Sequence, residues 1–129
     1  MAVLFTDIEG AARGFDRGFV TSSKDSKTEL LGIGPSLLDH NVAVSEVVAR
    51  SIVEGALNRS GANFAIGVTG FAGPAAPGEE EGLVHIAFAR RNSRTIHREE
   101  HFGPVGCGAI LLKSLKAMRD MVEQAFEEE

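Results

Sequence analysis

Hydroxyl and amine side chains are concentrated in the segment from residue 21 to residue 27. Those that could do chemistry are Thr21, Ser22, Ser23, Lys24, Ser26 and Lys27. A serine can act as a nucleophile when a desolvated, neutral lysine accepts its proton. Lys27 is the more interesting base, because it follows a predicted strand and begins a predicted helix at the expected ligand edge. Exposed loop hydroxyls and solvated lysines are the alternative interpretation of this pattern.

A second group alternates along a predicted strand. His97, Glu99 and His101 occupy every other position, so their side chains should project from one face. Two imidazoles and a carboxylate could bind zinc. Arg98 and Glu100 make the opposite face polar too, and no further ligand is evident. We therefore interpret the segment as a solvated strand face and predict no metal site.

The stretch from Asn63 to Pro74 combines an apolar run with a glycine-rich turn. Its first half, Phe64 to Val68, predicts a central strand buried on both faces of a parallel sheet. Loops at the carboxyl ends of such strands often bind ligands through backbone N–H groups and hydroxyls. The residues of this loop are Thr69, Gly70, Phe71, Ala72 and Gly73. A plain strand-to-loop turn is the alternative.

The elements that must position these groups follow from hydrophobic periodicity and from capping residues. Strands are predicted over 18–22, 64–68, 83–89 and 95–102, and helices over 24–31, from 35, over 45–61 and from about 107 onward. The last two strands should form a hairpin. The order of helices and strands predicts an α/β fold, a layered αβα domain with a mixed, largely parallel sheet and a long C-terminal helix.

Length and composition set the broad class. With 129 residues, 43% apolar and 24% charged, the chain fits one globular domain over 1–129. The net charge of -5 does not predict binding to nucleic acid, and it argues against binding to a membrane surface. Apolar runs are far shorter than the roughly 20 residues of a spanning helix, so we expect a cytoplasmic protein. Cys107 is the single cysteine, which excludes an intrachain disulfide.

Several segments resemble the C-terminal domain of the CinA family, the PncC-type nicotinamide-nucleotide amidohydrolases. The matching residues are Thr6–Gly10, Gly14–Thr21, Lys27, Leu31–Ile33, Val44–Glu46 and Thr69–Pro74, the last close to the family's T-G-I-A-G-P. The likeness covers nearly all of the chain in the same order. It implies hydrolysis of the carboxamide of nicotinamide mononucleotide by a serine nucleophile and a lysine base, without metal or cofactor. It also implies substrate contacts at Gly10 and at the turn over residues 69–73.

The chain departs from the family at the chemical centre. The family's nucleophilic serine falls on Ala12, and its tyrosine falls on Ser22, whereas the base position is kept as Lys27. The family's G-D-R-x-x-V-R pattern, whose arginines suit a phosphate, falls on residues 103–109, where no arginine stands. By this resemblance, the family's first strand and its glycine-rich A-E-S-C-T-G-G segment would precede Met1.

These departures lead to two hypotheses. The first is a CinA C-terminal-like protein with lost or impaired amidase activity, able to bind a small nucleotide-like ligand. The alternative is an active nicotinamide-nucleotide amidase that uses Ser22 or Ser23 with Lys27. We also expect a homo-oligomer, because a domain without the family's first strand exposes a sheet edge that must be paired or covered.

Overall fold

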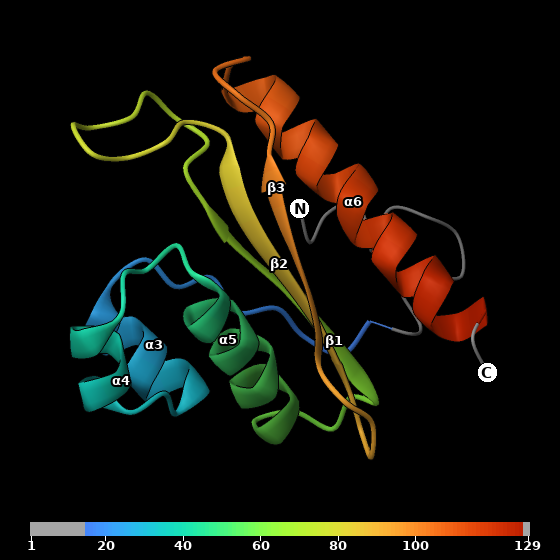
Figure 1. Ribbon diagram of the computed structural model, residues 1–129. Helices are drawn as coiled ribbons and strands as arrows, with labels where there is room; N and C mark the ends of the chain where they lie inside the picture. The colour runs from blue at the N-terminus through green and yellow to red at the C-terminus, as the bar shows by residue number, and fades with distance from the viewer. Residues whose placement is uncertain (1–14, 128–129) are drawn as a thin grey trace.

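The computed structural model describes residues 15–127 (Figure 1). Its elements are α3 (Lys24–Leu31), α4 (Pro35–His40), α5 (Glu46–Asn58), β1 (Phe64–Gly70), β2 (Leu83–Arg90), β3 (Ile96–His101) and α6 (Cys107–Glu127). The predicted helices and the β2–β3 hairpin are confirmed. The strand predicted over 18–22 is wrong, because this segment has no regular structure. Val20 within it is 94% exposed, so its apolar side chain has no packing partner to hold it in a sheet.

Capping residues explain where the helices begin and end. Ser23 caps α3 in a reciprocal capping box with Ser26, and Gly32 ends this helix with a φ of 70°. Pro35 stands at the start of α4, where its missing N–H costs no hydrogen bond. Ser45 caps α5 by accepting a hydrogen bond from the Val48 N–H. These signals are local, which is why the sequence predicts them well.

The three strands form one sheet in the order β1-β2-β3, and both strand pairs are antiparallel. The expectation of a largely parallel sheet is therefore wrong for residues 15–127. β1 lies at an edge of this sheet instead of its centre, and β2 is the strand with buried residues throughout its interior. Parallel neighbours need a crossover, usually a helix, whereas residues 71–82 connect β1 to β2 without one. An apolar run alone does not specify strand direction.

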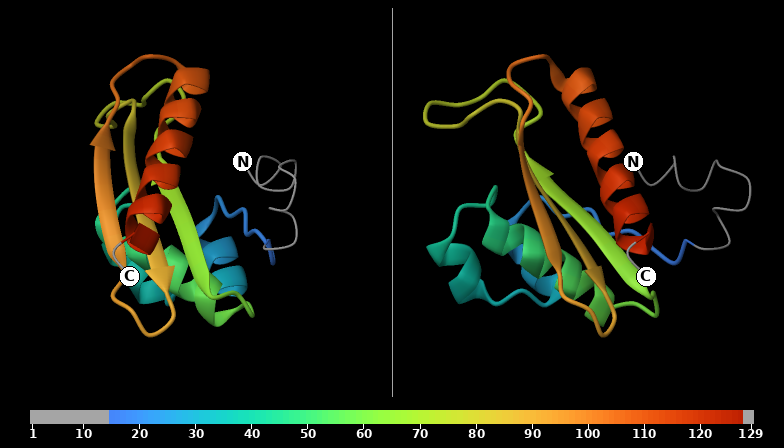
Figure 2. Two further views of the ribbon diagram at one scale, coloured as in Figure 1. Left: turned by 90° about the vertical axis from the view of Figure 1, so that its right-hand side faces the viewer. Right: turned by 45° about the vertical axis from the view of Figure 1, so that its right-hand side comes forward.

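Helices cover both faces of the sheet, so the predicted α/β class, αβα layering and long C-terminal helix are confirmed (Figure 2). On one face, Ala49, Val53 and Leu57 of α5 pack against Ala87 and Ala89 of β2. Gly67 of β1 allows this close approach: a Cβ there would lie 2.8 Å from Val53. Small side chains on this face thus bring α5 close to the sheet.

The opposite face carries the larger side chains and packs against α6. Its core contains Val84, Ile86 and Phe88 of β2 with Ile110 and Met118 of α6. Val84 and Ile86 alternate with His85 and Ala87, so β2 presents bulky residues to α6 and small or polar ones to α5. Within residues 15–127, no helix combines the length and the apolarity needed to cross a membrane.

The loop from residue 71 to residue 82 is closed at its base. The Gly82 N–H donates to the Phe71 carbonyl at 2.8 Å, and the Gly82 carbonyl accepts from the Phe102 N–H at 2.9 Å. Gly82 has a φ of 88°, and a Cβ there would lie 2.4 Å from the Gly103 carbonyl oxygen. Only glycine fits where the backbones of Gly82 and Gly103 approach this closely. This close approach holds the base of the loop beside the end of β3.

Candidate functional site

Lys27, the predicted base, is the fourth residue of α3 and is only 6% exposed. Its backbone N–H donates to the Ser23 carbonyl at 3.2 Å. Its amino group forms no hydrogen bond or ion pair with any residue of the described range. A desolvated amine without a carboxylate neighbour is the kind of setting in which a lysine can serve as a base. The retained base position is therefore compatible with the family's chemistry.

The serines near Lys27 are not arranged as its nucleophilic partners. The Ser23 hydroxyl accepts a hydrogen bond from the Ser26 N–H at 3.0 Å, and the Ser26 hydroxyl donates to the Ser23 carbonyl at 2.8 Å. Ser22 is exposed and makes no hydrogen bond to another residue of the described part of the chain. Neither Ser22 nor Ser23 contacts the Lys27 amino group within residues 15–127.

The glycine turn is held by its own backbone and by neighbouring segments. The Thr69 hydroxyl donates to the Ala43 carbonyl at 3.0 Å, and the Phe71 N–H donates to the Leu83 carbonyl at 3.0 Å. A Cβ on Gly70 would lie 2.9 Å from the Leu83 carbonyl oxygen, so glycine is required there. Ala72 packs against the core beneath α6. The Thr69 hydroxyl thus ties β1 to the segment before α5.

The predicted site is brought together only in part. Ala12 and Gly10 lie outside the described residues. Among the residues that the structure places, no hydrogen bond joins Lys27 to the turn over 69–73. Two surface cavities of about 460 and 420 Å³ lie elsewhere, along the β2–β3 hairpin. Neither is lined by Lys27 or by a residue of the turn.

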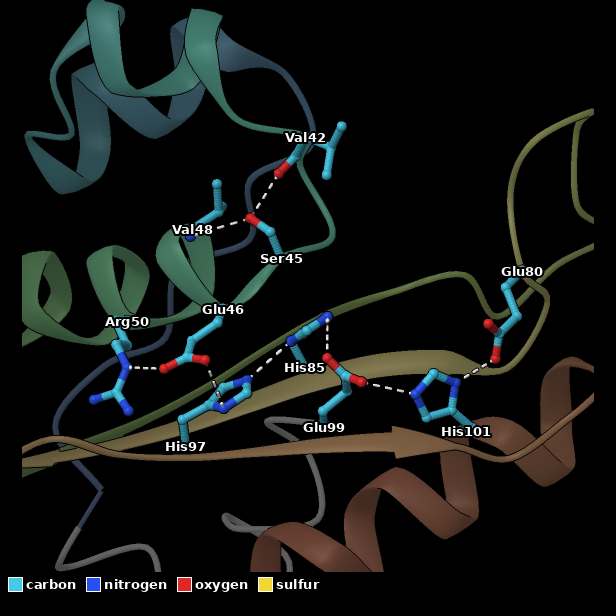
Figure 3. A network of polar contacts seen from close by, with 10 residues as sticks. All are labelled: Val42, Ser45, Glu46, Val48, Arg50, Glu80, His85, His97, Glu99 and His101. Carbon is cyan, nitrogen blue, oxygen red and sulfur yellow. Dashed lines mark hydrogen bonds and ion pairs between the residues drawn. The ribbon is translucent and has the colours of Figure 1, made fainter.

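A chain of histidines and carboxylates lies beside this turn, on the α5 face of the sheet (Figure 3). His85 pairs across the sheet with Thr69 on one side and with Glu99 on the other, so the three side chains share a face. His85 Nδ1 lies 2.9 Å from His97 Nε2, and the two ring centroids are 5.1 Å apart with their planes 24° from parallel. His85 Nε2 lies 3.5 Å from Glu99 Oε1. His85 therefore stands between a second imidazole and a carboxylate.

The chain continues at both ends into other elements. On the α5 side, His97 Nδ1 lies 3.6 Å from Glu46 Oε1, and Arg50 Nε donates to Glu46 Oε2 at 2.8 Å. On the other side, His101 Nε2 lies 2.8 Å from Glu99 Oε2. His101 Nδ1 makes a short contact with Glu80, in the loop before β2 (Figure 3). The polar groups thus connect the start of α5, two strands and this loop.

The contacts shift several pKa values in directions with clear causes. Burial lowers the pKa of His97, although the Glu46 carboxylate opposes this shift. The hydrogen bond from Arg50, followed by the charge of His97, lowers the pKa of Glu46. Hydrogen bonds to Glu80 and then Glu99 raise the pKa of His101, and the His101 bond lowers the pKa of Glu99.

The structure confirms that His97, Glu99 and His101 share one face, but it corrects their interpretation as a solvated face. The His97 side chain is only 11% exposed, whereas Glu99 and His101 are about half exposed. Within residues 15–127, no set of three or more His, Cys, Asp or Glu residues could hold a metal ion. Sequence reasoning missed His85, whose only signal was a polar residue within the buried run of β2.

Comparison with known proteins now identifies the family. A profile of the CinA C-terminal domain matches residues 1–126. The chain belongs to the CinA C-terminal domain family. A solved structure of the competence/damage inducible protein CihA from Agrobacterium tumefaciens is similar to this CinA C-terminal domain, with a TM-score of 0.89 and 39% identity, and the match covers 95% of this chain and 76% of that one.

Two curated relatives show the range of names among similar proteins. The nicotinamide-nucleotide amidohydrolase PncC of Enterobacter agglomerans is 40% identical over 104 residues, which cover 79% of this chain and 63% of that protein. A CinA-like protein of Akkermansia muciniphila is 42% identical over 97 residues, which cover 74% of this chain and 23% of that protein. This CinA C-terminal domain therefore spans less than two thirds of either relative.

Proposed function

We propose that this chain is a CinA C-terminal-like protein whose nicotinamide-nucleotide amidase activity is lost or strongly impaired. The proposal rests on Ala12, which by the resemblance stands where the family has its nucleophilic serine. A methyl group cannot attack a carbonyl carbon. Removing the nucleophile of a serine hydrolase lowers the rate on the order of 10⁶-fold, because only positioning and oxyanion donors remain.

The contacts of the nearby serines support this proposal. The Ser23 hydroxyl is engaged at the N-terminus of α3, where it accepts the Ser26 N–H. Its use as a nucleophile would cost the helix its cap. A nucleophile at another position would also need the substrate carbonyl to be presented differently, and misplacement of even 1 Å can cost about a hundredfold in rate.

What the chain retains favours binding of a small nucleotide-like ligand. Lys27 is a buried amine that pairs with no carboxylate of residues 15–127, and the glycine turn after β1 keeps the family's small residues. Residues 103–109 have no arginine, so a ligand phosphate would be held less tightly there than in the family. A cytoplasmic setting and self-association through the outer edge of β1 are further parts of the proposal.

The second candidate is an active amidase with a relocated nucleophile. Ser22 favours it, because this exposed hydroxyl has no hydrogen-bond partner among the residues that the structure places. By the resemblance, it stands at the position of the family's tyrosine. Lys27 would then take the proton of Ser22. This arrangement requires the segment before α3 to move so that the hydroxyl reaches the amine.

Nicotinamide mononucleotide followed by ³¹P and ¹H NMR separates these candidates. The first predicts ligand line broadening or shift changes without the appearance of nicotinic acid mononucleotide. Product formation that disappears in Ser22→Ala would establish the second. If the spectra show neither binding nor turnover, the nucleotide ligand is removed from the proposal. The variant Ala12→Ser tests whether a serine at this position restores activity.

A further inference from the structure

His85 and His97 on the α5 face form a pair of imidazoles that face each other through their ring nitrogens. We propose that His85 and His97 together bind one proton and exclude a second, and that this proton ties the start of α5 to the sheet and to the loop over residues 71–82. The proposal concerns the chain Glu46–His97–His85–Glu99 and its extension through His101 to Glu80 (Figure 3). It does not depend on any amidase activity.

Counting protons shows why a single bound proton suits this geometry. The contacts run from Glu46 to His97 at 3.6 Å, from His97 to His85 at 2.9 Å, and from His85 to Glu99 at 3.5 Å. Two neutral imidazoles carry one N–H each, which leaves one of these contacts between two acceptors. One additional proton places a single hydrogen in every contact. The outer N–H groups then point at carboxylates.

A second additional proton would break the arrangement. Both Nδ1 of His85 and Nε2 of His97 would carry hydrogen, and these atoms face one another at 2.9 Å. The two rings would also be cations with centroids 5.1 Å apart, in a place where His85 is 5% exposed. Like charges at this spacing make a second proton harder to add once the first is present, so the geometry favours one proton shared by the two rings.

Charged groups reach this site from α5, from β3 and from the loop before β2. Helix α5 supplies Glu46, which receives a hydrogen bond from Arg50. Strand β3 supplies Glu99 beside the pair and His101 beyond it. The loop before β2 supplies Glu80, and β1 contributes only the uncharged Thr69 as the cross-strand partner of His85. Carboxylates at both ends of the pair favour the singly protonated state.

The connection to the loop gives this proton a structural effect. Glu99 contacts His85 through Oε1 and His101 through Oε2, and His101 in turn contacts Glu80. Loss of the shared proton removes a hydrogen from one contact of this chain. The start of α5 and the loop over residues 71–82 should then loosen together, although they are far apart in sequence.

Long-range ¹H–¹⁵N NMR of the imidazole rings, recorded with backbone amide spectra between pH 4.5 and 8.5, tests the proposal. The rings of His85 and His97 should follow one shared proton-uptake step while the chain is folded. The amides of Glu46 and Glu80 should shift with the same midpoint. The proposal would be overturned if the two rings each took up a proton completely and independently. It would also be overturned if the chemical shifts of the Glu46 and Glu80 amides did not change at the shared step.

Variants give a matched comparison. In His97→Gln, the shift of the Glu46 amide at the shared midpoint should be lost, while the step at His101 persists. In His40→Gln the shared step should be unchanged, because His40 is exposed on α4 and contacts Ser36 instead. Should His97→Gln fail to fold, Glu46→Gln provides the second test, since removal of one flanking carboxylate must lower the midpoint of the shared step. An unchanged midpoint would contradict the proposal.

Discussion

Ser23 and Ser26 cap α3 reciprocally: the Ser23 hydroxyl accepts the Ser26 N–H at 3.0 Å, and the Ser26 hydroxyl accepts the Ser23 N–H at 3.1 Å. This relationship engages the hydroxyl that lies one helical turn before Lys27. A residue that caps a helix is poorly placed to serve as a nucleophile, because the same oxygen would have to leave its N–H partner. The structural role of Ser23 can be measured separately from catalysis.

We predict that Ser23→Ala lowers the free energy of unfolding by about 0.5 to 2 kcal/mol, the usual cost of losing an N-cap. Ser22→Ala is the matched control, because Ser22 is exposed and has no hydrogen bond within residues 15–127. It should change stability by less than about 0.5 kcal/mol. Urea denaturation followed by circular dichroism measures both. Equal effects of the two substitutions would argue that the capping box does not stabilise α3.

The contact between α3 and α5 gives a second prediction. A Cβ on Gly55 would lie 2.2 Å from the Leu31 carbonyl oxygen, so Gly55→Ala forces the two helices apart. We expect a loss of about 1 to 3 kcal/mol, typical of overpacking, despite the better helix propensity of alanine. Gly61→Ala meets no atom within 4 Å and should be nearly neutral. Thermal unfolding of both variants would show whether this order holds.

The pH dependence of stability should contain an acid-side component from His97. Burial lowers the pKa of His97 below 6.5, and in the proposed pair this corresponds to the excluded second proton. Between the two values the unfolded chain therefore binds one proton more than the folded chain. The contribution is fully present above pH 6.5 and is lost as the pH falls through the lowered pKa. His97→Gln should therefore flatten the decline in the free energy of unfolding between pH 6.5 and 5. An unchanged slope would contradict this assignment.

His101 should act with the opposite sign. Hydrogen bonds to Glu80 and Glu99 raise its pKa, so its contribution is fully present below 6.5 and is lost as the pH rises through the raised pKa. Because the group is exposed and screened by solvent, we predict a direction only. The variant His101→Gln should therefore lack the part of the fall in the free energy of unfolding above pH 6.5 that comes from loss of the His101 proton. Urea titrations at pH 6 and pH 8 provide the comparison.

The proposed self-association also has a direct test. Within the described sheet, β1 is hydrogen-bonded to β2 on one side only. Exposed strand edges are normally paired or covered. Size-exclusion chromatography with light scattering should give at least twice the monomer mass of 13.7 kDa. A clean monomer at micromolar concentration would remove this part of the proposal.

Local signals allowed the helices to be predicted, whereas spatial relationships between strands could not be. Ser23 and Gly32 delimit α3 because capping depends on nearby residues, and Ser45 marks the start of α5 in the same way. The apolar residues of β1 fit an edge strand of an antiparallel sheet as well as a central strand of a parallel one. Which of the two forms depends on the neighbouring strands and helices, and the sequence of this segment alone does not specify them. The direction of β1 relative to its neighbour was therefore predicted wrongly, whereas the β2–β3 hairpin was predicted correctly.

In the candidate site, too, the local sequence predicts some relationships, whereas others depend on the fold. Alternation placed His97, Glu99 and His101 on one face, which the cross-strand register confirms. The partner His85 comes from another strand, and Glu46 comes from a helix far away in sequence, so only the fold brings them together. The roles of Ala12 and Gly10 stay predictions, because both residues lie outside the range that the structure describes.

The release of ammonia from nicotinamide mononucleotide by the unmodified chain tests the central claim most directly. A coupled glutamate dehydrogenase assay should be run with an active PncC amidohydrolase as the positive control and with Lys27→Ala as the background. We predict a rate for the chain on the order of 10⁶-fold below the active enzyme, close to that of Lys27→Ala. Turnover of about 1 s⁻¹ or faster that Lys27→Ala abolishes would contradict the account.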